Sequence, residues 1–294
     1  MTWKRVATAA VLIPCVVGLV LWGSTAFVAI GTALVILLAL FEYFALGEAI
    51  GHRAYRFWTA TCALLLVYVQ WLPSFLPSDD RQQWSEWESR YQHMWLFMRQ
   101  PPGIQETFFI FVLGIAAITL ATRRPIVEAL PAAGISTSGL ILVAFPLSFA
   151  VRLHGLGTDG PVLLLFALVI TWVGDTAAYF VGRAIGKHKL ARALSPGKSW
   201  EGSVASILGA LLVGVAFARW TTIPLPHLLG MAALGNIAGQ AGDLLESAYK
   251  RSAGVKDSGS LLPGHGGILD RIDALILAIP VVWYYWIWIY LPSR

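Results

Sequence analysis

Four acidic residues in the last third of the chain form two pairs, each with the spacing of about one helical turn. Asp243 and Glu246 occur in "GQAGDLLES", and Asp270 and Asp273 occur in "ILDRIDAL". Residues three apart share one face of a helix, so each pair can present two carboxylates to a neighbouring helix. If the two segments pack as antiparallel helices, the pairs converge. Crowded carboxylates require a cation, and hard oxygen ligands suit Mg²⁺.

Basic residues and glycines accompany these acids. Lys250, Arg251 and Lys256 precede "PGHGG", whose glycines let the backbone approach a ligand closely. A helix starting at about Ile268 would point its free N–H groups at the same place, which predicts an anion site. A cation held by carboxylates beside basic residues is typical of phosphoryl or nucleotidyl transfer.

The alternative is that each acid simply pairs with a nearby base, as Asp270 could with Arg271 or Glu246 with Lys250. A fifth acid, Asp175 in "TWVGDTAAYF", argues for a shared site, because five such residues at one depth are harder to explain separately. For His265, a phosphate or loop contact, proton transfer and a structural hydrogen bond all stay open.

The elements that must position these residues are membrane helices. The 294 residues are 57% hydrophobic and 13% charged, against about 25% charged residues in soluble domains. We expect an all-α polytopic integral membrane protein with about nine transmembrane helices. The predicted spans are residues 6–22, 26–46, 57–76, 106–121, 135–151, 161–182, 200–220, 227–249 and 268–291.

The distribution of basic residues predicts the orientation. Connections on the side of the N-terminus carry fourteen Lys and Arg residues, and those on the other side carry six. Cytoplasmic loops are enriched in these residues, so the N-terminus is expected in the cytoplasm and the C-terminus outside. The first span is longer than a signal-peptide core, and we expect it to be retained. All five acids then lie toward the cytoplasmic ends of their spans. An acid deep in a membrane helix costs about 2.5 to 3.5 kcal/mol, so such residues usually face a polar cavity or have partners.

Two long connections differ in character. Residues 77–105 place several Trp residues on one helical face, which predicts an interfacial anchor or, alternatively, a partner-binding surface. Residues 183–199, "RAIGKHKLARALSPGKS", carry five basic residues and face the cytoplasm beside the acids. We divide the chain into N-terminal helices, 1–155, and a catalytic region, 156–294.

The C-terminal motifs resemble the signature of phosphatidate cytidylyltransferases, also called CDP-diacylglycerol synthases. The matching residues are Ser247, Lys250, Arg251, Lys256, Asp257, Gly259, Leu262, Pro263, His265, Gly266, Gly267, Asp270, Arg271 and Asp273. The segments 174–202 and 239–251 are also similar to that family. Tyr249, Gly197 and Ala274 depart from its usual pattern. Gly197 stands where the family more often has a lysine, and the loss of that lysine is expected to weaken one phosphate contact.

The resemblance implies that CTP and phosphatidate react to give CDP-diacylglycerol and pyrophosphate for phospholipid synthesis. It implies Mg²⁺, a second, monovalent cation such as K⁺, a homodimer in the inner membrane of a bacterium, and no nucleic-acid partner. The attack would be in line, with no covalent enzyme intermediate. The residues assigned are Asp243, Asp270 and Asp273 for the metal, supported by Asp175 and Glu246; Lys198, Lys250, Arg251 and Lys256 for triphosphate charge; and Ser195, Ser199, His265, Gly266 and Gly267 for substrate binding.

Three other functions are considered. A transporter or channel would spread charges through the membrane depth, whereas here they gather at one face. A CTP-dependent lipid kinase, such as a polyprenol kinase, would place similar groups around a different phosphorus atom. A non-catalytic scaffold would leave the acid cluster unexplained.

Overall fold

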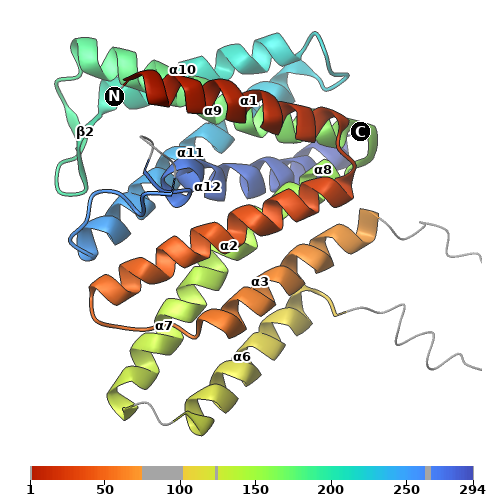
Figure 1. Ribbon diagram of the computed structural model, residues 1–294. Coiled ribbons are helices and arrows are strands. Elements are labelled where there is room, and N and C mark those ends of the chain that lie inside the picture. The colour runs from red at the N-terminus through yellow and green to blue at the C-terminus, as the bar shows by residue number, and fades with distance from the viewer. Residues whose placement is uncertain (1, 75–101, 123–124, 262–265, 294) are drawn as a thin grey trace, which may run out of the picture.

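The described part of the chain folds mainly into long helices and contains one small hairpin (Figure 1). The computed structural model describes residues 2–74, 102–122, 125–261 and 266–293. The principal elements are α1 (Thr2–Trp22), α2 (Thr25–Ala49), α3 (Arg56–Trp71), α6 (Ile104–Ala121), α7 (Ala129–Gly139), α8 (Phe145–His154), α9 (Gly160–Ile185), β1 (Lys189–Ala191), β2 (Ser195–Ser199), α10 (Trp200–Phe217), α11 (Leu225–Ser252) and α12 (Leu269–Tyr285). A π-helical turn, Leu140–Ala144, joins α7 to α8, and another, Trp286–Tyr290, extends α12.

The predicted spans agree with the helices. Each of the nine overlaps one helical segment of the described chain, with α7 and α8 forming one segment. Six of these segments are long and apolar enough to cross a membrane, so the protein is an all-helical membrane protein in its main architecture. The predicted interfacial helix at 77–105 falls almost wholly on residues 75–101, which lie outside the described part of the chain.

The all-α prediction is confirmed, and one short hairpin lies among the helices. Within the basic connection, Lys189 pairs with Ser199 and Ala191 with Ser195 in an antiparallel hairpin. The sequence "SPGKS" explains the departure, because Pro196 and Gly197 disfavour a continuous helix. The hairpin ends directly at α10, where the Ser199 hydroxyl accepts a hydrogen bond from the Gly202 amide (3.2 Å).

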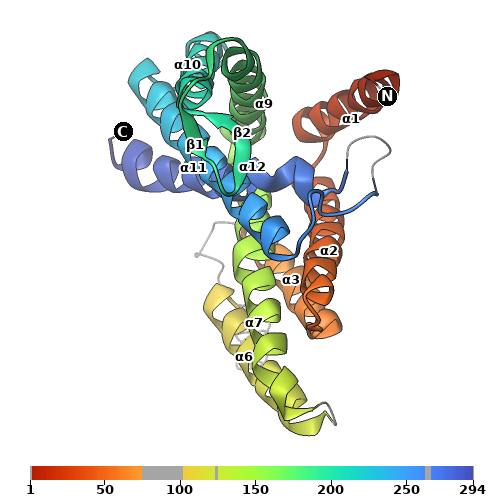
Figure 2. The same ribbon diagram turned by 90° about the vertical axis from the view of Figure 1, so that its left-hand side faces the viewer.

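Two apolar cores meet at α12. The first lies among α9, α10, α11 and α12 and includes Phe166, Ile170 and Met231. The second lies among α2, α3 and the α7–α8 segment, and α12 contributes Leu269 and Ile276 to it. Figure 2 shows α6 and α7 extending away from the α9–α11 group, with α12 between the two regions. Because α12 borders both cores, a change in either half can reach its first turn.

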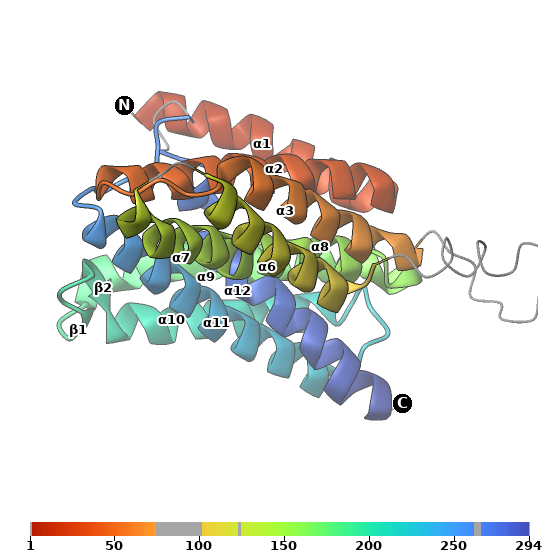
Figure 3. The same ribbon diagram turned by 90° about the horizontal axis from the view of Figure 1, so that it is seen from below.

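The two ends of the helical assembly carry different parts of the chain. In Figures 1 and 3 the N-terminus and the β1–β2 hairpin lie at one end, and the C-terminus lies at the other. The segment that follows α11 lies at the same end of the helical assembly as the hairpin (Figure 3). This arrangement puts the two basic connections near the acid pairs on one side of the fold.

Polar side chains tie α10 to α11 inside the fold. The Gln240 amide nitrogen donates to Asn236 Oδ1 (2.8 Å), and Gln240 Oε1 accepts from Ser203 Oγ (2.5 Å). These residues lie just before Asp243 on α11. In lipid, helices associate through close packing and such polar contacts rather than through the hydrophobic effect. Gln240 therefore holds α11 against α10 near the acid pair, and Asn236, which donates to the Ile170 carbonyl oxygen (3.3 Å), holds it against α9.

Small residues bring α11 and α12 close together at the same depth. A Cβ atom added at Gly242 would overlap the carbonyl oxygen of Asp273, and one added at Gly239 would lie 3.3 Å from the Ala274 carbonyl oxygen. The side chains on either side of this contact are then held near one another. The close approach of the two helices positions the acidic pairs.

Gly242→Ala is expected to destabilise the protein because the new methyl group must push α12 away. Overpacking of this kind costs about 1 to 3 kcal/mol, which would appear as a lower Tm of the detergent-solubilised protein. Gly134→Ala on α7 is the matched control, since a Cβ atom there meets nothing within 4 Å. Equal Tm values for the two variants would contradict the close helix contact.

Candidate active site

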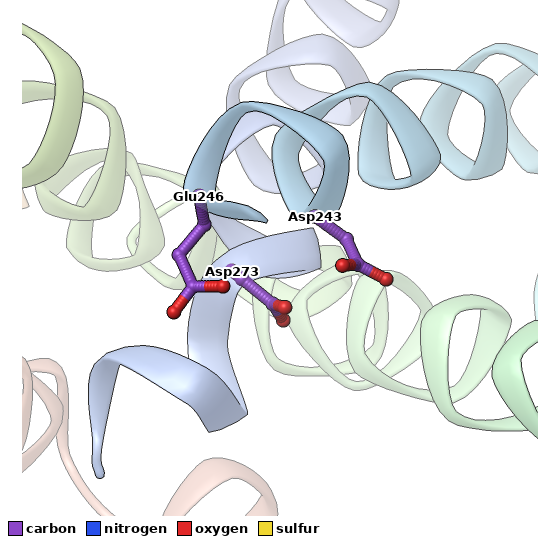
Figure 4. A group of neighbouring side chains, drawn as sticks. All are labelled: Asp243, Glu246 and Asp273. Carbon is purple, nitrogen blue, oxygen red and sulfur yellow. The ribbon is translucent and has the colours of Figure 1, made fainter. Parts of the chain in front are cut away.

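Three carboxylates from α11 and α12 form one cluster. Asp243, Glu246 and Asp273 each offer an oxygen atom, and these atoms lie within 4.8 Å of one another. Figure 4 shows Asp243 and Glu246 on one helix, with the Asp273 side chain from the facing helix between them. Glu246 is buried and the two aspartates are partly buried. The predicted convergence of the two acidic pairs is thus observed for these three residues.

Asp175 supplies a fourth carboxylate from α9. It interacts electrostatically with Asp243, Lys198 and Arg271, and Asp273 interacts with Asp175 as well. Asp175 is more exposed than the others. The cluster therefore draws on three helices that the sequence separates by tens of residues.

Two lysines offset this negative charge. Lys198 of β2 places its Nζ atom 2.6 Å from Asp243 Oδ2. Lys250, at the end of α11, places its Nζ atom 2.5 Å from Glu246 Oε2 and 2.6 Å from Asp270 Oδ1. Lys250 is buried with Glu246, so each charge needs the other.

Asp270 binds the loop before α12, and its side chain also interacts with Glu246 of the three-carboxylate cluster. Its Oδ2 atom accepts hydrogen bonds from the backbone amides of Ser258 (3.0 Å) and Gly267 (2.8 Å). Its Oδ1 atom accepts from Lys250. Asp270 thus holds the loop and Lys250 together, and its assignment as a metal ligand stays a prediction.

A buried glutamate that the sequence reasoning missed completes this region. Glu42 of α2 accepts hydrogen bonds from the Ser258 hydroxyl and from the amides of Ile268 and Leu269, each at 2.9 Å. Glu42 is buried, with 4% of its surface exposed. An isolated Glu in the apolar sequence "LALFEYFAL" was the available signal, since a carboxylate in a membrane helix normally has partners.

The free amides predicted at the start of the last span are not free. Glu42 binds two of them, and Asp270 binds the amide of Gly267. The positive end of α12 therefore faces two carboxylates of the chain itself. These amides of the predicted anion site are thus occupied by side chains of the chain, and Gly266 lies in the left-handed region at φ +80°. The assignment of Gly266 and Gly267 to substrate binding stays a prediction.

The remaining predicted residues lie in the hairpin, at the start of α10 and in the segment after α11. Arg251 donates to the carbonyl oxygens of Leu194 (3.2 Å) and Val255 (2.9 Å), which joins the hairpin to the loop after α11. Lys256 is exposed. Ser195 lies at the start of β2, and Ser199 caps α10. His265 lies outside the described residues.

The chemistry of the cluster fits a hard divalent cation. All of its donors are carboxylate oxygens, the ligand type that Mg²⁺ prefers. Glu246 Oε1 is buried and has no hydrogen-bond partner among the described residues. A buried, unpartnered carboxylate oxygen is costly unless a cation is near it. Asp243, Glu246 and Asp273 are therefore the residues that could hold Mg²⁺.

Comparisons with known proteins identify the family of the chain. The sequence model of the Cytidylyltransferase family matches residues 3–289. A phosphatidate cytidylyltransferase of Haemophilus influenzae is 44% identical over 137 residues, which cover 44% of this chain and 47% of that protein. The Bacillus subtilis protein of the same name is 38% identical over 153 residues, covering 51% and 57%. The chain matches about half the length of these relatives. It belongs to the cytidylyltransferase family.

Proposed function

We propose that this protein transfers a cytidylyl group from CTP to phosphatidate, giving CDP-diacylglycerol and pyrophosphate. Family membership and the names of the relatives support a nucleotidyl transfer. The observation that carries the proposal is the cluster of Asp243, Glu246 and Asp273 with Lys198 and Lys250 beside it. A cation site flanked by positive side chains suits a triphosphate substrate.

In this proposal the chain positions two phosphates and neutralises their charge. Asp243, Glu246 and Asp273 would hold Mg²⁺, with Asp175 nearby. When bound, the ion would offset phosphate charge and polarise the phosphoryl oxygens. Lys198, which pairs with Asp243 at 2.6 Å, would offset the charge of the triphosphate.

The bond changes are those of an in-line displacement. A phosphatidate oxygen forms a bond to the α-phosphorus of CTP, and the bond from that phosphorus to the α–β bridging oxygen breaks. Pyrophosphate leaves with the electron pair. The nucleophile is an ionised phosphate oxygen, since the second pKa of a phosphate ester is about 6, so no side chain has to remove a proton. Arg251 and Lys256 add positive charge near the loop, and His265 contacts phosphate or positions the loop.

We propose that the site faces the cytoplasm of a bacterial cell, where CTP is available, and that phosphatidate approaches from the membrane. Support comes from the basic hairpin and the N-terminus lying at one end of the fold. A monovalent cation such as K⁺ and a homodimer are proposed from the family resemblance.

Purified wild-type protein is expected to move label from α-phosphate-labelled CTP into lipid only when phosphatidate and Mg²⁺ are present. Asp243→Asn should reduce this turnover by more than about 100-fold, beyond the 10- to 100-fold typical of residues outside the first ligand shell. Asp270→Asn should remove nearly all turnover without reducing expression. The control is Glu48→Gln, whose carboxylate pairs with Arg56 at 2.6 Å.

Label entering lipid from γ-phosphate-labelled CTP instead would identify a lipid kinase and overturn the proposal. Near-normal turnover of Asp243→Asn would contradict the metal assignment.

Asp273→Asn is expected to weaken the stabilisation of the protein by Mg²⁺. Without a divalent cation the variant should melt at or above the wild-type Tm, because one of three repelling charges is gone. Mg²⁺ at about 100 times its Kd should stabilise the wild type by about 2.7 kcal/mol and the variant much less. The measurement is the Tm in EDTA and in Mg²⁺. An equal Mg²⁺ effect on both proteins would exclude Asp273 from the cation site.

The proposed orientation predicts opposite labelling of the two ends of α10. In a Cys15→Ser, Cys62→Ser background, Arg192→Cys in the hairpin connection should react with an impermeant maleimide only in inside-out vesicles. Arg219→Cys, beyond the other end of α10, should react on intact cells, and both positions are exposed. The reverse pattern would place the acid cluster outside the cytoplasm.

A further inference from the structure

Glu42 connects the N-terminal helices to the loop and helix that carry the acidic residues. Its carboxylate and the Ser258 hydroxyl are 216 positions apart in sequence and 2.9 Å apart in space. Oε1 accepts from the Ile268 amide, and Oε2 accepts from Ser258 and from the Leu269 amide. Three donors from the signature segment thus converge on one side chain of α2.

The surroundings of Glu42 are shaped for a carboxylate. All three partners are donors, and an ionised carboxylate is acceptor-only, so charge and hydrogen-bonding direction agree. The positive end of α12 adds a favourable charge interaction. A Cβ atom at Gly259 would lie 2.6 Å from Glu42 Oε1, and one at Gly267 would overlap Oε2. Glycine at both positions leaves room for this side chain.

The bonds of Glu42 lie next to those of Asp270. Glu42 holds Ser258 through its hydroxyl, and Asp270 holds the same residue through its amide. Asp270 also binds Lys250, which contacts Glu246 of the carboxylate cluster. A shift of the loop or of the first turn of α12 would therefore move Lys250 and, one turn further along α12, Asp273.

We propose that Glu42 is a positioning residue for the active site. It fixes the loop and the N-terminus of α12 so that Asp273 and the Lys250–Glu246 pair take the geometry that binds the cation. Glu42 does not touch substrate in this role. The inference rests on the proposed function for its kinetic consequences, whereas its structural consequence can be measured without turnover.

Glu42→Gln is the main test variant. Glutamine keeps the size of the side chain but sets an NH₂ group against backbone or hydroxyl donors. Glu48→Gln on the same helix is the matched control, because Glu48 pairs with Arg56 instead. Ser258→Ala removes one of the three donors and keeps the test decisive if Glu42→Gln fails to fold.

The first readout is hydrogen exchange of peptides covering Ile268 and Leu269 in the Mg²⁺-free protein. Glu42→Gln is expected to speed exchange of these amides by about 10-fold, the effect of losing one net hydrogen bond, while peptides of α10 are unchanged. The second readout is kinetic. The Mg²⁺ concentration for half-maximal turnover should rise, and kcat should fall by roughly 10- to 100-fold, with KM for phosphatidate within about twofold of wild type.

A double-mutant cycle separates positioning from general destabilisation. If Glu42 acts through Ser258, the kinetic cost of Ser258→Ala should largely disappear in the Glu42→Gln background, whereas additive effects are expected for independent sites. Glu42→Asp, which keeps the charge, should recover part of the Mg²⁺ response.

If Glu42→Gln has the same amide exchange rates and the same Mg²⁺ response as the wild type, the inference is overturned and the proposed function stays intact. If the wild-type protein itself transfers no cytidylyl group, the proposed function fails. Accelerated exchange at Ile268 and Leu269 would then still establish the contact. Normal Mg²⁺ response together with fast exchange would restrict Glu42 to a structural role and overturn its positioning role.

Discussion

Electrostatic repulsion among Asp243, Glu246 and Asp273 is the constraint on which the C-terminal half depends. Their oxygen atoms lie within 4.8 Å of one another, and two unit charges 4 Å apart interact by about 4 kcal/mol at an effective dielectric constant of 20. Small residues on α11 and α12 nevertheless hold these acids together. Lys198 and Lys250 offset part of the charge, and the remainder favours a cation. The uncompensated negative charge of the cluster thus favours a bound cation, and such a cation would also attract the negatively charged phosphates of the proposed substrates.

Elements from both halves of the chain complete this region. The hairpin brings Lys198 and the end of α11 brings Lys250, whereas Glu42 of α2 binds the amides at the first turn of α12. The hairpin and α2 are far from α12 in sequence, and α11 directly precedes it. The N-terminal helices are therefore more than a membrane anchor in this account, since one of them bonds directly to the loop beside the acids.

The sequence was most informative where local pattern determines structure. Long apolar stretches predicted the helices, and the three-residue spacing of Asp243 with Glu246 predicted a shared face that the structure bears out. Spacing alone did not distinguish Asp270 from Asp273. Both lie on the first turns of α12, yet Asp270 meets backbone amides of the loop and Asp273 meets the carboxylates of α11. That difference depends on the path of the loop.

Long-range contacts explain what the sequence did not predict. The partners of Glu42 lie more than 200 residues away, so no local periodicity points to them. The same contact overturned the expected anion site, because a helix terminus looks free until a distant side chain is placed on it. The hairpin was missed for a related reason, since its short strands are stabilised by pairing with each other and by the start of α10.

The most direct measurement of the central claim is the location of a bound divalent cation. Mn²⁺ can replace Mg²⁺ at oxygen-rich sites, and its anomalous scattering can be mapped in crystals of the full chain. The account predicts a peak within about 2 to 3 Å of carboxylate oxygens of Asp243, Glu246 or Asp273. A peak confined to other residues, or none at saturating Mn²⁺, would contradict it.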